Sequence, residues 1–181
     1  MKRHNLINPF FYLVILMSIA GATLASPPVF AGWETKSAVS LDPVTVSESY
    51  QKQEDIEEFR EEVIRLINKE RADKDLHELE EFQELTGLAD IRAEESAAVF
   101  SHTRPNQENC STIYSDYGLP YSAVGENLSY GFSSPEKLVE AWMNSETHRE
   151  NILNANFFYV GIGLYVNKSG ALYCSQLFYA P

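Results

Sequence analysis

Basic residues are scarce in this sequence, with 14 Lys and Arg against 26 Asp and Glu and a formal net charge of −12. A protein that neutralises nucleic-acid phosphates needs clustered Lys and Arg, and the sequence has no such cluster. We therefore exclude nucleic acid as a partner, and also an anionic bilayer bound through charge. The aromatic content of 12% is too high for an acidic disordered chain, so a folded protein is expected.

Several catalytic motifs are also missing. The sequence has no Gly-x-Ser-x-Gly elbow, no phosphate-binding loop, no dinucleotide fingerprint and no His-Glu-x-x-His zinc motif. The many acidic residues offer pairs of carboxylates for glycoside chemistry, but no spacing singles one pair out. A chain of 181 residues suits one ordinary domain, which excludes an enzyme with a separate cofactor domain.

Long apolar runs are missing except at the N-terminus. A short basic segment precedes an apolar stretch over 10–25, and small-residue cleavage sites follow at Ala25 and Ala31. This layout is typical of a secretory signal peptide, which we place over residues 1–31. The stretch is shorter than the ~20 residues of a spanning helix, so a membrane is expected as a partner only if the segment stays uncleaved. The predicted location is extracellular or in the cell envelope.

The sequence has two cysteines, Cys110 and Cys174, and both lie in the part predicted to be exported. An even number of cysteines outside the cytosol favours a disulfide between them, and two free thiols are the alternative. A catalytic thiol is the least expected role, because neither cysteine has basic neighbours in the sequence that would lower its pKa.

Apolar periodicity indicates three helices followed by two strands. The predicted elements are helices over 55–69 and 81–100 and from Pro135, and strands over 157–166 and 171–179. A hairpin turn is expected at 168–170, and a polar, turn-rich stretch over 101–125. Helices before an antiparallel pair predict an α+β or layered α/β/α domain over 54–181, preceded by a flexible linker over 32–53.

Histidine is also scarce, and two of the four histidines lie in polar loops at structural junctions. His102 follows the second predicted helix, and His148 follows the third. Such imidazoles are candidates for a metal or acid–base site. Glu126 lies between Gly125 and Asn127, where a carboxylate could ligate a metal, orient an imidazole or cap a turn. All three roles stay open from the residues alone.

Eight motifs, taken together, resemble the bacterial branch of the CAP superfamily, which comprises the cysteine-rich secretory, antigen 5 and pathogenesis-related proteins and is also named for its SCP domain. The resemblance covers roughly residues 56–179, and the motifs occur in the order of that family. They are LINKER (66–71), LADIRA (88–93), FSHTRP (100–105), GENL (125–128), AWMNS (141–145), HRENIL (148–153), FYVGIG (158–163) and QLF (176–178).

The resemblance implies a three-layer α/β/α sandwich with a central antiparallel sheet and a cleft lined by two His and two Glu that can hold a divalent metal. The matching cleft positions are His102, Glu126 and His148, with Asn127, Ser145 and Glu146 as accessory candidates. Ser145 stands where eukaryotic members carry the second Glu, so the ligand set is incomplete and weak metal binding is expected. Two imidazoles and one carboxylate suit Zn²⁺ better than Ca²⁺ or Mg²⁺. The resemblance also supports pairing of Cys110 with Cys174.

The function expected from these observations is a secreted, non-enzymatic binding module. Its cleft would take a small apolar or lipid-like ligand, a cell-envelope component or a protein partner. The alternative is a metal-assisted, protease-like extracellular hydrolase, with His102 and His148 as ligands and Glu126 as a ligand or the general base that activates water.

Overall fold

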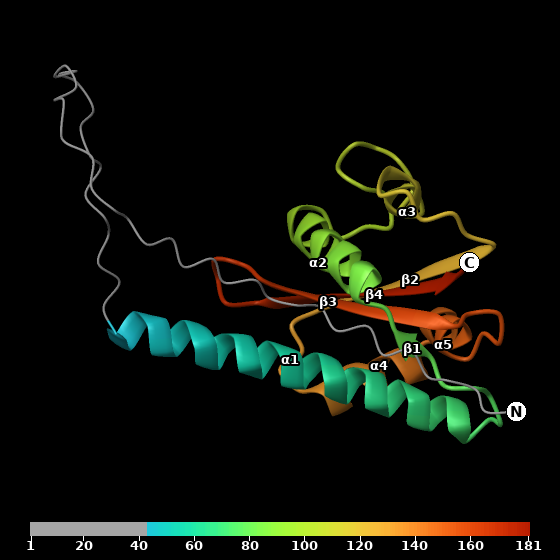
Figure 1. Ribbon diagram of the computed structural model, residues 1–181, viewed down its shortest axis with the longest axis horizontal. Helices are drawn as coiled ribbons and strands as arrows, with labels where there is room; N and C mark the ends of the chain where they lie inside the picture. Colours follow the sequence, from blue (N-terminus) through green and yellow to red (C-terminus); the bar gives the residue numbers. More distant parts are fainter. Residues whose placement is uncertain (1–42) are drawn as a thin grey trace, which may run out of the picture. The chain divides into compact units, whose positions relative to one another are not determined.

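The computed structural model describes residues 43–181, with side chains from residue 53, and consists of one sheet with helices on both faces (Figure 1). The predicted signal peptide lies outside the described residues. No helix within the described part of the chain is both long and apolar enough to cross a membrane. The elements are α1 (Pro43–Ala72), β1 (Glu80–Glu81), α2 (Gln83–Ala98), α3 (Thr112–Asp116), β2 (Ala123–Tyr130), α4 (Pro135–Asn144), α5 (Glu146–Ile152), β3 (Tyr159–Val166) and β4 (Leu172–Ala180).

Helix α1 is longer than its apolar pattern indicates. It begins at Pro43, inside the predicted linker, so 43–53 is the first part of this helix and the linker prediction needs correcting there. Proline is well suited to a first helical position because its missing N–H has no helical partner to lose. Once the packed part of a helix has formed, each further turn extends it at little cost, which a search for apolar positions does not detect.

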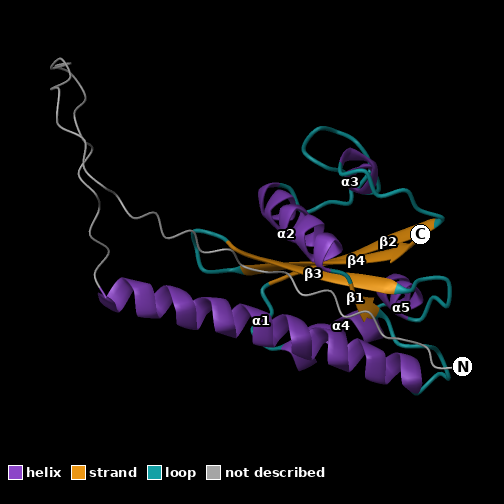
Figure 2. Ribbon diagram, viewed as in Figure 1, coloured by secondary structure: helices purple, strands orange, loops and turns teal. Residues whose placement is uncertain are grey.

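The four strands form a mixed sheet in the order β1-β3-β4-β2 (Figure 2). Strand β4 pairs antiparallel with both β3 and β2, as predicted for the hairpin, whereas β1 pairs parallel with β3. The antiparallel sheet expected from the resemblance is therefore mixed at one edge. The hairpin turn is stabilised by the Asn167 side chain, which accepts hydrogen bonds from the backbone of Ser169 and Ala171, and by Gly170 at φ 83°.

The two faces of the sheet carry different helices, with α2 and α3 on one side and α1, α4 and α5 on the other (Figure 1). The α1 side holds the larger apolar cluster, which includes Trp142 of α4 and Phe178 of β4. On the other side α2 lies almost on the backbone of β3. A Cβ at Gly163 would come within 1.9 Å of the backbone of Ala89, so only glycine permits this contact.

The predicted helices over 81–100 and from Pro135 are confirmed as α2 and α4, and both strands of the hairpin are confirmed within two residues. The α+β class and the layered arrangement are confirmed as well. Strand β2 and the short helices α3 and α5 were not predicted. Strand β2 lies at an edge of the sheet, and its residues Glu126 and Asn127 are buried. The sequence pattern had suggested a turn at these two residues.

Candidate functional site

A buried ion pair between α2 and β2 forms the centre of the candidate site. Arg92 Nε donates to Glu126 Oε2 at 2.7 Å, and Arg92 Nη2 donates to Oε1 at 3.1 Å. The side chains are 1% and 2% exposed, so both charges are removed from water and each compensates the other. His102 Nδ1 lies 2.8 Å from Glu126 Oε1 and completes a row of three groups that leads from the protein interior to the surface.

The guanidinium of Arg92 also fixes the segment that carries His102. Its Nη2 donates to the carbonyl of Ser101 at 3.0 Å, one residue before the imidazole. Its Nη1 donates to Glu95, which in turn accepts from Arg104 of the same loop. Arg104 is buried and pairs with Asp116 of α3 at 2.6 Å. Several charge-assisted hydrogen bonds therefore hold the loop between α2 and α3 in place, and such bonds are stronger than neutral ones.

The imidazole of His102 is the solvent-facing end of this row, with 59% of its side chain exposed. A hydrogen bond with Cys110 and a second one with Glu126 raise the pKa of His102 to about 9, against an opposing effect of burial. Both partners favour the protonated ring. At neutral pH the metal-free protein therefore presents an oriented imidazolium at this position.

The predicted disulfide is wrong, because Cys110 and Cys174 are both free thiols. Cys174 lies on β4 in the apolar cluster on the α1 side. Cys110 lies next to His102 and Glu126. Glu126 is the register partner of Leu177 on the neighbouring strand β4, and Leu177 packs on the α2 side, so Cys110 lies on that side as well. The sheet thus separates two sulfurs that a disulfide would have to bring within bonding distance. Burial raises the pKa of the Cys174 thiol, which leaves it unreactive.

Cys110 instead joins the site. One donor atom each from His102, Cys110 and Glu126 lies within 4.8 Å of the other two, and this cluster could hold a metal ion. His148 is not a member of the cluster. The sequence predicted two of the three residues, but it assigned Cys110 to a structural bridge.

His148 lies on α5, which contacts β2. Its imidazole is half-buried, and burial lowers its pKa, as does the positive charge of His102. The helix is attached to β2 beside Glu126, because Asn127 Nδ2 donates to the His148 carbonyl at 3.1 Å and Asn151 Nδ2 donates to the Glu126 carbonyl at 3.1 Å. Asn127 therefore positions α5 relative to β2, and its side chain faces away from the Glu126 carboxylate.

The other two accessory candidates lie at the start of α5. Ser145 occupies the N-cap position of this helix without a side-chain capping hydrogen bond, and its hydroxyl lies 3.5 Å from that of Thr147. Glu146 is the first residue of α5 and is exposed to solvent. Neither side chain belongs to the donor cluster at His102.

Three aromatic rings form a surface near the end of α2, which we call the aromatic surface: Phe100, Tyr130 and Tyr173. Phe100 meets Tyr130 edge to face with ring centres 4.9 Å apart, and Tyr130 stacks on Tyr173 at 5.6 Å. Phe100 and Tyr130 are 49% and 57% exposed, so they are available to a ligand. Phe100 precedes His102 by only two residues in the chain.

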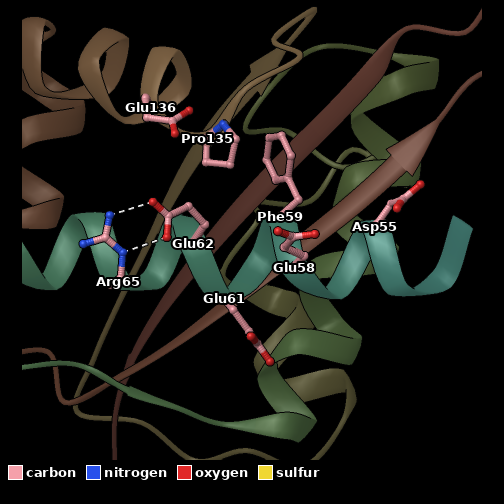
Figure 3. Close-up of a pocket in the computed structure, with 8 residues that line it drawn as sticks. All are labelled: Asp55, Glu58, Phe59, Glu61, Glu62, Arg65, Pro135 and Glu136. Carbon is pink, nitrogen blue, oxygen red and sulfur yellow. Dashed lines mark hydrogen bonds and ion pairs between the residues drawn. The ribbon is translucent and has the colours of Figure 1, made fainter. Parts of the chain in front are cut away.

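A hollow of about 620 Å³ lies elsewhere, between α1 and the start of α4 (Figure 3). Carboxylates dominate its lining, and Arg65 forms an ion pair with one of them, Glu62, at 2.6 Å. The other polar groups at this hollow are exposed acids, without the nitrogen and sulfur donors found at His102. We therefore take the His102 cluster, and not this hollow, as the candidate functional site.

Sequence reasoning missed Arg92, the residue that organises the site. A signal was present, because Arg92 occurs on the apolar stripe of α2, four residues after Leu88 and beside Ala93. A charged residue on a buried helix face needs a buried partner of opposite charge. Glu126 is that partner, and the pairing would have placed it in the interior instead of in a turn.

Comparison with known proteins supports the same fold. Residues 64–178 match the model of the CAP family, the cysteine-rich secretory protein family. The Bacillus subtilis protein YkwD is 35% identical over 120 residues, which cover 65% of this chain and 46% of YkwD.

Among solved structures, an extracellular SCP-domain protein of Bacillus anthracis aligns with a TM-score of 0.63 at 24% identity, over 69% of this chain and 41% of that one. An outer surface protein of Borrelia burgdorferi aligns with a TM-score of 0.61 at 21% identity, over 70% and 92%. The chain thus matches less than half the length of YkwD and of the Bacillus anthracis protein. With the family model covering most of the described domain, the chain belongs to the CAP family of cysteine-rich secretory proteins.

Proposed function

We propose that this protein is an exported, non-enzymatic binding module that holds a component of the cell envelope on its aromatic surface. Export is supported by the signal-peptide pattern at residues 1–31 and by relatives described as an extracellular protein and an outer surface protein. The observation that carries the binding role is the aromatic surface, in which Phe100 and Tyr130 are exposed and Tyr130 stacks on the partly buried Tyr173. Aromatic rings are large apolar contact surfaces that lose little side-chain entropy on binding.

The ligand class follows from this surface. Stacked and edge-on rings bind planar or apolar faces, such as lipid-like chains or ring-containing envelope components. Burying such a face contributes about 25 cal/mol per Å² of apolar area removed from water. The protein is acidic overall, so apolar contact and not general charge attraction would supply the affinity.

The proposal also includes a divalent cation, with Zn²⁺ as the preferred ion, held weakly by the donor cluster at His102. The donors present fit such an ion, because an imidazole and a carboxylate lie together with a thiol. Weak binding is expected, since the metal has to displace the proton that His102 holds strongly.

The alternative, a metal-assisted hydrolase, has less support from the geometry. A general base has to accept a proton from water, but both oxygens of Glu126 already accept hydrogen bonds from Arg92, and Oε1 also contacts His102. Zn²⁺-dependent cleavage of a peptide library that disappears in Glu126→Gln would favour the hydrolase over the binding module.

Co-sedimentation of the purified protein with an isolated bacterial cell-envelope fraction tests the binding proposal. We expect Phe100→Ala and Tyr130→Ala each to weaken binding at least tenfold. Tyr117→Ala is the matched control, because Tyr117 is also 57% exposed but follows α3, away from this surface. Binding that is equal in all three variants, or no binding of the wild type, would contradict the proposal.

A further inference from the structure

Cys110 is held opposite His102 by the backbone. The Cys110 N–H donates to the His102 carbonyl at 2.9 Å, and Thr103 and Asn109 form an antiparallel bridge between them. His102 and Cys110 therefore lie opposite each other, at the two ends of the loop formed by residues 103–109. Arg104 fastens the same loop to Glu95 and Asp116, so the relation between thiol and imidazole is fixed by the fold.

The donor atoms of His102, Cys110 and Glu126 are close enough for one ion. All three lie within 4.8 Å of one another. Metal–ligand bonds of about 2.0–2.3 Å in a tetrahedral site separate neighbouring donors by about 3.5 Å, so small side-chain rotations suffice. His102 Nδ1 and Glu126 Oε1 already lie 2.8 Å apart, so these two donor atoms face each other and could bind the same ion.

A cation at this site needs a negatively charged ligand besides Glu126. Arg92 already pairs with the Glu126 carboxylate through two hydrogen bonds, so little of the negative charge of that group is left for a cation. A thiolate at Cys110 would supply the missing negative charge. Thiolate and imidazole ligands favour Zn²⁺ and related transition metals, whereas Ca²⁺ and Mg²⁺ require oxygen donors.

We propose that Cys110 is a thiolate ligand of a transition-metal site that it forms with His102 and Glu126. This inference rests on the cation in the proposed function and is independent of the envelope ligand. It gives Cys110 a role as a donor in place of the disulfide expected from the sequence. It also predicts selectivity for Zn²⁺ and Co²⁺ over Ca²⁺ and Mg²⁺.

Co²⁺ spectroscopy on the metal-free, fully reduced wild-type protein tests this directly. Thiolate ligation produces a near-ultraviolet sulfur-to-cobalt charge-transfer band, which imidazole and carboxylate ligands do not produce. We expect this band to saturate at one Co²⁺ per chain, to disappear on addition of Zn²⁺, and to persist in excess Ca²⁺ or Mg²⁺. Cys110→Ser should abolish the band and weaken Zn²⁺ binding at least tenfold.

Cys174→Ala is the matched control and should leave the band unchanged, because this thiol is buried on the other side of the sheet. Blocking Cys110 with a small thiol reagent in the native wild-type protein should have the same effect as Cys110→Ser, and it does not depend on a variant that folds. Co²⁺ binding without the band, or a band that survives both treatments, would overturn the thiolate ligand but leave a cation site. Absence of any Co²⁺ binding would overturn the cation proposal as well.

Discussion

The two faces of the sheet bury different chemistry. On the face covered by α1, α4 and α5, a continuous apolar cluster is centred on Trp142, Phe157 and Phe178. On the face covered by α2, the apolar cluster is smaller, and it borders the buried Arg92–Glu126 pair that supports His102. Apolar packing tolerates substitutions of similar volume, whereas a buried charge pair requires both partners. The comparison indicates that one face mainly stabilises the domain and the other mainly positions the site.

Trp142→Ala tests the stabilising face. The indole is 2% exposed and packs in the large cluster, so its loss should lower the free energy of unfolding by about 3–5 kcal/mol. Denaturant unfolding measures the effect. The pKa of His102 in the folded variant should stay at its wild-type value, and a large change in it would show that the two faces are not separable.

Arg92→Met tests the other face. It leaves the Glu126 carboxylate buried without its guanidinium, which should lower the free energy of unfolding by about 3–5 kcal/mol. Adding Glu126→Gln removes the unpaired charge, so the double variant should be more stable than Arg92→Met alone by about 1–3 kcal/mol. If the two substitutions proved additive in the double-mutant cycle, the pair would not be coupled as described.

Gly163→Ala tests how closely α2 approaches the sheet. The added Cβ would lie 1.9 Å from the backbone of Ala89, so the helix has to move, at a cost of about 3 kcal/mol. Because Arg92 lies on the same helix, the metal-free His102 pKa should fall as well. Gly87→Ala is the control: a Cβ there meets nothing within 4 Å, and the variant should gain about 0.5–1 kcal/mol. Equal stability in the two variants would refute the close approach.

The sequence predicted the elements with strong periodicity and missed those defined by tertiary contacts. Helices α2 and α4 and the β3–β4 hairpin follow from apolar spacing and turn residues. Strand β2 does not, because its buried acid and asparagine are acceptable in a strand only when Arg92 and Asn151 donate hydrogen bonds to their side chains. Tertiary contacts of this kind override local propensity.

The site likewise contains contacts that the sequence predicted and contacts that only the tertiary structure defines. His102 and Glu126 were predicted to meet, and they do so at 2.8 Å. The position of Cys110 beside these two residues was not predicted, because the count of two cysteines in a protein predicted to be exported favoured a bridge. The two thiols lie on opposite sides of the sheet, and that depends on strand order and loop path, which residue counts do not contain. Whether His148 contributes to the same site stays a prediction.

The pH dependence of stability follows from the same groups, with opposite signs for the two histidines. The pKa of His102 is raised to about 9 in the folded state from ~6.5 when unfolded, so its contribution to stability is fully present below pH ~6.5 and is lost as the pH rises through about 9. The pKa of His148 is lowered, so its contribution is present above ~6.5 and is lost as the pH falls through its folded-state pKa. The free energy of unfolding, measured against pH, should therefore lose its high-pH decrease in His102→Ala and its low-pH decrease in His148→Ala.

The most direct test is a histidine titration of the metal-free protein by NMR, in the wild type and in Glu126→Gln. The pKa of His102 should be about 9 in the wild type, raised by Cys110 and Glu126, and that of His148 should lie below 6.5. Glu126→Gln should lower the pKa of His102 and leave Phe100, Tyr130 and Tyr173 in place. A His102 pKa near 6.5, or one that Glu126→Gln does not change, would contradict a site built from the buried Arg92–Glu126 pair outward to the His102 imidazole.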